Sequence, residues 1–297
     1  MKPVAPLFTV ALAIWSFANA QIPIAPGAEP KLVSAGFKFT EGPVADDEGN
    51  VYFTDQPNDR IMKWTVGEDH VSTFLEPAGR SNGLEFDGKG HLIACADEKG
   101  QLWSIDVKTK KTEVLLDRFQ GKLFNGPNDV WIHKDGGMYF TDPFYKRDYW
   151  QGRDKPEQEA QRVYYLAKGA KEPVIVEETL VQPNGIAGSP DGTTLFVADI
   201  GAKKTYRYRI GPDGKLTDRS LFCEMGSDGM ALDAAGNLYL TGKGVTVFDK
   251  DGKQLGVIPI DKPWTANVSF GGKDMKTLFI TASDAVFTVE MSVKGYR

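Results

Sequence analysis

The sequence predicts an all-β fold, a six-bladed β-propeller whose blades are four-stranded antiparallel sheets. Three observations predict it. A phrase of two short strands around an Asp- and Gly-containing turn recurs six times, and its copies are 40 to 57 residues apart. No window after residue 20 shows a sustained helical stripe. A repeat of this length has room for about four short strands, which is typical of propeller blades rather than of solenoid coils.

The six copies align on one bulky residue in the second strand of each phrase. The first copy is PVADDEGNVYFTD from Pro43, and the last is VSFGGKDMKTLFITA from Val268. The aligned residues are Tyr52, Leu92, Tyr139, Phe196, Tyr239 and Phe279, at intervals of 40, 47, 57, 43 and 40 residues. Alternating segments such as RIMKWTV and HVSTFL follow most copies, and they predict the third and fourth strands.

The ring has to close between the two ends of the chain. The last copy ends with three strands, at FTVEMSV, and one additional strand, KLVSAGF from Lys31, precedes the first copy. We expect this N-terminal strand to join the last blade as its fourth strand. A ring closed in this way leaves only short, protected sheet edges.

The longest interval contains an insertion, residues 145–161 (YKRDYWQGRDKPEQEAQ), which is dense in charged and aromatic residues and lacks strand alternation. Such a segment is read as a loop over one face of the ring. It is either a lid or a solvated crossover with no role, and the sequence leaves both readings open.

The first twenty residues have the pattern of an export signal. Lys2 provides a positive start, an apolar run follows over residues 4–17, and ANA at residues 18–20 is an A-x-A cleavage site. The alternative, a membrane anchor, is disfavoured because a spanning helix needs about 20 apolar residues. We expect an exported protein, periplasmic or secreted, with residues 21–297 as one propeller domain that has no membrane association after cleavage.

Composition restricts the class of partner and of metal site. The formal net charge is −5 with no basic block, which argues against nucleic acid or an acidic membrane surface as a partner. Cys95 and Cys223 lie in different repeats, so we expect two buried free thiols rather than a bridge. Three histidines with no H-x-x-H or C-x-x-C pair argue against zinc held by nitrogen and sulfur ligands, which leaves oxygen ligands.

Each repeat opens with a residue that carries a side-chain oxygen. These residues stand 10 to 12 positions ahead of the aligned bulky residue, so they occupy equivalent places in the six blades. They are Glu41, Asn82, Asn128, Asn184, Asp228 and Asn267. Because the innermost strands of a propeller run beside its axis, we expect these six residues, here named the axial ring, to converge on the central channel.

A turn role is the alternative for part of the axial ring. Asn-Gly and Asp-Gly are turn formers that tolerate positive φ, which would account for Asn82, Asn184 and Asp228. It does not account for Glu41, which precedes Gly-Pro, or for Asn128, whose neighbour begins a strand. Two carboxylates and several amide oxygens suit one hard divalent cation. Ca²⁺ fits best, with Zn²⁺, Mg²⁺ and Mn²⁺ as alternatives.

The motifs that carry these residues resemble a known family. FTEGPVADDEGNVYFTD, NGPNDVWIHKDGGMYFTDP, QPNGIAGSPDGTTLFVADI, SDGMALDAAGNLYLT and NVSFGGKDMKTLFITA are similar to segments of the gluconolactonase, regucalcin (senescence marker protein) and luciferin-regenerating-enzyme family, over about residues 36–285. The resemblance implies a six-bladed propeller, one axial divalent metal and hydrolysis of a sugar lactone such as gluconolactone. It implies Glu41, Asn128, Asn184 and Asp228 as the metal ligands.

Two departures from the family concern the substrate. Bacterial gluconolactonases usually carry an E-H-G-N-R-R-like stretch after the second-blade strand, whereas this chain has CADEKGQLW, without His or Arg. Animal regucalcins carry an Arg two residues before the Asn of blade three, and Gly126 stands there in this chain. Both departures leave the implied metal ligands unchanged and put the choice of substrate in question.

The residues suggest a mechanism as a hypothesis. A cation would polarise the lactone carbonyl, and Asp228 is the candidate that accepts the proton of the attacking water. Glu41 could do the same, but its motif favours a purely ligating role. Asn82 and Asn267 are placed to bind sugar hydroxyls or a metal-bound water. Further candidates for substrate binding, each of which could equally be a turn or rim residue, are Asn58, Arg60, Asp142 and Tyr145.

Other functions remain compatible with these residues. The same metal site could serve another esterase, a phosphotriesterase, or a xylono- or arabinolactonase. A non-catalytic binding module is a different class of function, since propellers often present loops to partners and fold alone does not fix function. Metal content separates the binding module from the hydrolases, and a panel of substrates separates the hydrolases from one another.

Overall fold

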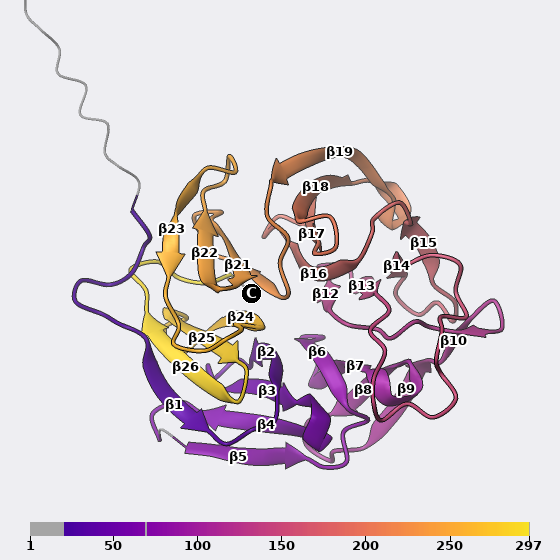
Figure 1. Cartoon of the computed structure of the whole chain (residues 1–297), viewed down its shortest axis with the longest axis horizontal. Helices are drawn as coiled ribbons and strands as arrows, with labels where there is room; N and C mark the ends of the chain where they lie inside the picture. Colours follow the sequence, from indigo (N-terminus) through magenta and orange to yellow (C-terminus); the bar gives the residue numbers. More distant parts are fainter. Residues whose placement is uncertain (1–20, 69, 297) are drawn as a thin grey trace, which may run out of the picture.

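The computed structural model describes residues 21–68 and 70–296. Six four-stranded antiparallel sheets surround a central channel (Figure 1), so the predicted all-β propeller fold is confirmed. The predicted export signal, residues 1–20, lies outside the described residues. Within the described residues, no helix is long and apolar enough to cross a membrane.

Each blade is a meander that runs from the axis outward. The innermost strands are β2 (Thr40–Ala45), β6 (Ser81–Phe86), β12 (Val130–Ile132), β16 (Pro183–Gly188), β20 (Met230–Leu232) and β24 (Asn267–Gly271). The second strands are β3 (Val51–Asp55), β7 (His91–Ala96), β13 (Met138–Asp142), β17 (Thr194–Asp199), β21 (Leu238–Gly242) and β25 (Thr277–Ala282).

The outer halves of the blades follow the same order. The third strands are β4 (Arg60–Thr65), β8 (Gln101–Asp106), β14 (Arg162–Leu166), β18 (Lys204–Ile210), β22 (Gly244–Phe248) and β26 (Ala285–Glu290). The fourth strands are β5 (His70–Leu75), β9 (Thr112–Leu116), β15 (Val174–Glu177), β19 (Leu216–Cys223), β23 (Gln254–Ile258) and β1 (Lys31–Ala35). A small hairpin, β10 (Arg118–Phe119) and β11 (Lys122–Leu123), precedes blade three.

The N-terminal strand closes the ring as predicted. Strand β1 pairs antiparallel with β26, and Lys31 faces Thr288. The last blade therefore has the order β1-β26-β25-β24, so that one strand comes from the N-terminal end of the chain and three come from the C-terminal end. This pairing removes two open edges that would otherwise expose unpaired backbone groups.

The aligned bulky residues form the hydrophobic layers between blades. All six lie in second strands, and none is more than 7% exposed. Tyr52 illustrates their role, because its ring packs edge-on against Phe74 of its own blade at 4.9 Å and against Phe86 of the next blade at 5.3 Å. Such contacts bury apolar surface between neighbouring sheets and hold the ring together. Cys95 and Cys223 are buried free thiols.

A glycine follows four of the six axial ring residues and permits close packing between blades. A Cβ at Gly83 would lie 2.6 Å from the Asn128 carbonyl oxygen, and one at Gly229 would lie 1.8 Å from the Asn267 side chain. Neither glycine has a positive φ. The turn interpretation of Asn82-Gly83 is therefore wrong: the pair lies inside β6, and glycine is needed there because the next blade leaves no room for a side chain.

In five of the six blades, the inner strand is irregular at the axial ring residue or begins after it, whereas β24 pairs regularly from Asn267 onward. The register between β2 and β3 shifts between Glu41 and Val44, and equivalent shifts interrupt the ladders of β6 and β16. In blades three and five the inner strand begins two residues after the ring residue. A bulge of this kind re-aims a side chain out of the regular alternation.

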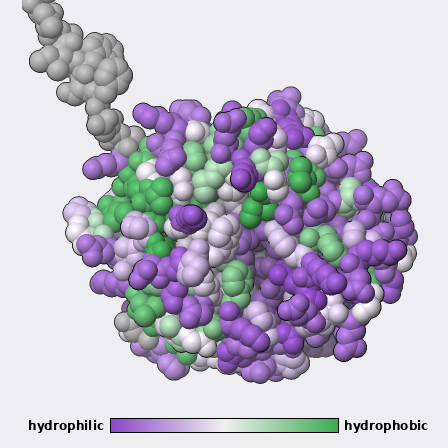
Figure 2. Space-filling model, viewed as in Figure 1, coloured by the Kyte–Doolittle hydropathy of each residue, from purple (hydrophilic) through white to green (hydrophobic). Residues whose placement is uncertain are grey.

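Hydrophilic residues cover most of the face seen in Figure 2. This surface agrees with a chain of which 25% of the residues are charged and whose formal net charge is −5.

Candidate active site

Two carboxylates from blades one and five meet at the axis. Glu41 in β2 is 2% exposed, and its Oε2 accepts hydrogen bonds from its neighbour Gly42 N at 2.7 Å and from Asn267 Nδ2 at 3.1 Å. Asp228, before β20, accepts from Trp264 Nε1 at 2.6 Å and from Asn184 Nδ2 at 2.8 Å. The two carboxyl groups lie close enough for the charge of Asp228 to raise the pKa of Glu41. Residues 187 positions apart are thus brought together at the axis.

The carboxyl pair is electrostatically unfavourable unless a positive charge or a proton lies between its members. Burial, followed by the charge of Asp228, raises the pKa of Glu41 well above its ordinary value. Burial also raises the pKa of Asp228, although hydrogen bonds from Trp264 and Asn184 and the charge of Arg147 oppose that shift. The donors around Asp228 therefore offset part of the cost of its charge, whereas burial and the charge of Asp228 both act against ionisation of Glu41.

Among the described residues, the side-chain oxygen of Asn184 accepts no hydrogen bond. Its Nδ2 donates both to Asp228 Oδ1 at 2.8 Å and to the Tyr145 hydroxyl at 2.9 Å. Both N–H groups are then engaged, and the amide flip is fixed by the network. In the described part of the chain, the side-chain amides of Asn82 and Asn128 hydrogen-bond no other residue. Their oxygens are available to a ligand.

These residues fit one hard cation. Two buried carboxylates and free amide oxygens form the donor set that Ca²⁺ accepts, and its charge would relieve the repulsion within the pair. Among the described residues, no group of three or more His, Cys, Asp or Glu side chains could hold a metal ion. A cation at the axis would therefore depend on asparagine oxygens, with Glu41, Asn128, Asn184 and Asp228 as the set that would hold it.

The predicted substrate residues lie in different surroundings. Asn267 contacts Glu41 and uses its oxygen to accept from Val268 N at 2.8 Å, so it supports a carboxylate. Tyr145 reaches Asn184, and burial raises the pKa of its hydroxyl, which stays protonated. The three other side chains make structural hydrogen bonds. Asn58 and Arg60 donate to Asp55 Oδ2 at 2.8 and 2.6 Å, and Asp142 accepts from Asn125 N and Gly126 N.

Two residues at the site were missed by sequence reasoning. Trp264, in the loop before β24, holds Asp228, and Arg147, in the insertion, places its charge near Asp228. Trp264 stands three residues before Asn267. The short distance in sequence between Trp264 and a ring residue could have indicated its role. For Arg147, the only signal in the sequence was the high charge density of the insertion.

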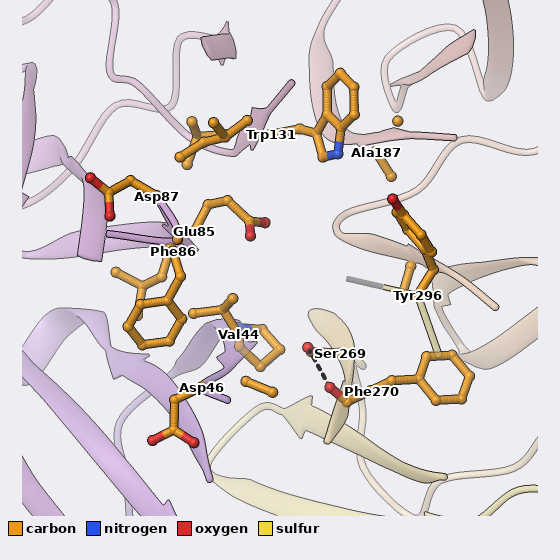
Figure 3. Close-up of a pocket in the computed structure, with 18 of the residues that line it drawn as sticks. Val44, Asp46, Glu85, Phe86, Asp87, Trp131, Ala187, Ser269, Phe270 and Tyr296 are labelled. Atoms are coloured by element: carbon orange, nitrogen blue, oxygen red, sulfur yellow. Dashed lines mark hydrogen bonds between the residues drawn. The ribbon is translucent and has the colours of Figure 1, made fainter. Parts of the chain in front are cut away.

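A cavity of about 1020 Å³ occupies the opposite part of the channel. Figure 3 shows Glu85, Phe86, Trp131 and Tyr296 around it, and the lining continues along the later residues of the inner strands. The lining includes Asn267 and Asp129 but none of the four candidate ligand residues. Burial, followed by the charge of Asp129, raises the pKa of Glu85 to about 8. We name this part the lower channel.

Comparisons with known proteins point to one family. The family model described as "SMP-30/Gluconolactonase/LRE-like region" matches residues 39–284. A gluconolactonase of Zymomonas mobilis is 31% identical over 89% of this chain and 82% of its own length. A 6-deoxy-6-sulfogluconolactonase of Pseudomonas putida is 33% identical over 78% of this chain and 79% of its own length. The solved structure of a gluconolactonase from Xanthomonas campestris has a TM-score of 0.83 and 27% identity, and the match covers 91% of both chains.

Proposed function

Because the chain belongs to the SMP-30/gluconolactonase/LRE-like family, we propose that it hydrolyses a sugar lactone such as gluconolactone to the aldonic acid, with one divalent cation, best Ca²⁺, at the axis. The observation that carries the proposal is the pair of buried, electrostatically coupled carboxyl groups of Glu41 and Asp228 beside the oriented Asn184 amide. Two buried carboxylates lower the stability of the fold when nothing compensates their charges. A bound cation would compensate them, and this electrostatic gain would contribute to its affinity.

The residues of the chain divide the work. Glu41, Asn128, Asn184 and Asp228 would hold the cation, which supplies polarisation of the lactone carbonyl when bound. Asn267 and Gly42 N orient Glu41, and Trp264 orients Asp228. These hydrogen bonds are in place before any substrate binds, so no reorganisation is needed when charge develops on the carbonyl oxygen.

Asp228 is the proposed proton acceptor. As water adds to the lactone carbonyl carbon, its proton passes to Asp228, and the bond from that carbon to the ring oxygen then breaks. The departing ring oxygen takes the proton and becomes the new hydroxyl of the aldonic acid. The hydrogen bonds from Trp264 and Asn184 favour the ionised form of this acceptor and oppose the rise in its pKa that burial causes.

The test is a substrate panel after chelation. The protein is stripped of metal and assayed with gluconolactone, xylonolactone, arabinolactone, an aryl ester and a phosphotriester, each with Ca²⁺, Zn²⁺ or Mg²⁺. We expect lactone hydrolysis that is lost on chelation and restored best by Ca²⁺. Hydrolysis of the phosphotriester or aryl ester alone would replace the proposed substrate class, and full activity without metal would refute the cation.

We also propose that the protein is exported, because residues 1–20 have the charge, apolar run and A-x-A site of an export signal. N-terminal sequencing of the protein recovered outside the cytoplasm should begin at Gln21. A chain that stays in the cytoplasm with its first twenty residues intact would contradict the proposal.

A further inference from the structure

An aspartate ends the second strand in three blades and immediately follows the second strand in a fourth. In the three blades where it ends the strand, its carboxylate binds the backbone just before the axial ring residue, an arrangement that we call the clamp. Asp55 accepts from the backbone N–H groups of residues 38 and 39, Asp142 from those of 125 and 126, and Asp199 from those of 181 and 182. In each blade the clamped groups stand two and three residues before the ring residue. This clamp therefore sets the position of the ring side chain.

Asp97 in blade two does not take part in this clamp. Asp59 of the preceding blade takes its place, because Asp59 Oδ1 accepts from Ala78 N at 3.0 Å and from Arg80 N at 2.6 Å. The Asp97 side chain is 1% exposed, and its Oδ2 instead accepts from Arg147 Nε at 3.0 Å and from the Tyr149 hydroxyl. This buried carboxylate therefore binds the insertion, whereas its counterparts in the three other blades bind the backbone before the ring residue.

The rest of the insertion is anchored at the same point. The Asp97 carbonyl accepts from Trp150 Nε1 at 3.1 Å, and the Arg153 guanidinium packs over the Trp150 ring at 3.9 Å. Trp150 in turn fills the space above Gly126, where a Cβ would lie 2.5 Å from Asp97 Oδ1. The glycine at this position is therefore required by the anchor of the insertion.

This anchor brings Arg147 to the axial site. The Arg147 guanidinium lies 5.2 Å from the centre of the Tyr145 ring, whose hydroxyl accepts from Asn184. Arg147 is 24% exposed, and within the described residues only its Nε donates a hydrogen bond. Its two terminal nitrogens are left to donate to a ligand. Because Asp97 offsets part of its charge, this donor pair is suited to neutral hydroxyl groups as well as to anions.

We propose that Arg147 binds adjacent ring hydroxyl groups of the sugar lactone and selects hydroxylated over unsubstituted lactones, with Asp97 as its positioning residue. The inference rests on the proposed lactone hydrolysis. A guanidinium presents two parallel N–H groups in a rigid fork, which matches a pair of neighbouring oxygens. A site built to hydrogen-bond substrate hydroxyls discriminates strongly against the analogue that lacks them, because its own polar groups are then left unpaired.

The experiment compares KM and kcat for gluconolactone and for δ-valerolactone, which has no hydroxyl groups. We expect Arg147→Met to raise KM for gluconolactone at least tenfold, with kcat within about threefold and KM for δ-valerolactone unchanged. Arg147→Lys, which keeps the charge and loses the fork, should give an intermediate KM. Lys146→Met is the matched control: it removes the same charge one residue away, from a side chain that is 65% exposed, and should leave both substrates unaffected.

Asp97→Asn tests the positioning role. It should raise KM for gluconolactone at least threefold, and combined with Arg147→Met it should add nothing, since both changes remove one interaction. Calorimetric Ca²⁺ binding and the melting temperature of each variant show that metal site and fold persist. Equal loss for both lactones, or an unchanged KM in Arg147→Met, would overturn this inference alone. A wild type that hydrolyses no lactone would overturn the proposed function and this inference together.

Discussion

The two ends of the central channel are lined by the same six strands, yet they differ in how their carboxyl groups are held. At the axial ring, Glu41 and Asp228 accept hydrogen bonds from a backbone N–H, two asparagines and a tryptophan. In the lower channel, Glu85 faces a cavity of about 1020 Å³ and accepts from the backbone N–H of its neighbour Phe86. Asp129, which also lines this cavity, accepts from the backbone N–H groups of Val130 at 3.0 Å and Ile186 at 3.3 Å.

The difference shows that the cavity of the lower channel is not where the chemistry is best supported. Both ends have carboxyl groups with raised pKa values, and burial is the main cause in both. At the axial ring, side-chain donors from Asn184, Trp264 and Asn267 orient the two carboxyl groups, as catalysis by preorganised charge requires. The donors to the lower-channel carboxyl groups are backbone N–H groups. Hydrogen-bond partners therefore distinguish the ends better than volume or pKa does.

The sharpest test of this contrast is Asp228→Asn. We expect at least a thousandfold loss in kcat, because the variant loses the proton acceptor and one ligand charge. The fold should persist, since removing one charge relieves the repulsion from Glu41 while costing one good hydrogen-bond acceptor. Steady-state kinetics and a thermal melt check both parts. Retained turnover would remove Asp228 from the mechanism.

A second test addresses the glycines that bring the blades together at the ring. Gly229→Ala should destabilise the fold by about 3 kcal/mol, because the new Cβ would lie 1.8 Å from the Asn267 side chain that supports Glu41. Gly211→Ala is the control: its φ is −97° and its nearest neighbouring atom would be 3.4 Å away. Urea unfolding measures both, and equal stabilities would mean that the blades shift apart easily.

Ca²⁺ should stabilise the protein through the same residues. At a concentration one hundred times its dissociation constant, a cation that binds only the folded state adds about 2.7 kcal/mol to the free energy of unfolding. We expect the melting temperature to rise accordingly in the wild type, and to rise much less in Asp228→Asn. A similar rise in both proteins would place the cation elsewhere.

The sequence predicted the periodic parts of this molecule better than its contacts between blades. The six aligned bulky residues and the closing strand follow from local pattern, and all of them lie where the pattern predicted. The axial ring followed from the same period. The Asp97–Arg147 pair did not, because it joins residues 50 positions apart and depends on an insertion without periodicity. The reason for Gly126 also became visible only with Trp150 in place.

The smallest expected effect, that of Glu85→Gln, tests the lower channel by itself. The folded-state pKa of Glu85 is about 8 against the ordinary 4.5, so the folded protein keeps a proton that the unfolded chain releases above about pH 4.5. This group therefore lowers stability as pH rises from about 4.5 to 8, and glutamine removes that loss. We expect the variant to gain stability over the wild type between pH 5 and pH 8.5 in urea unfolding, with kcat/KM within threefold. Among the described residues, no hydrogen bond joins Glu85 to the axial ring. A tenfold fall in kcat/KM would therefore contradict the separation of the two ends and show that they act together.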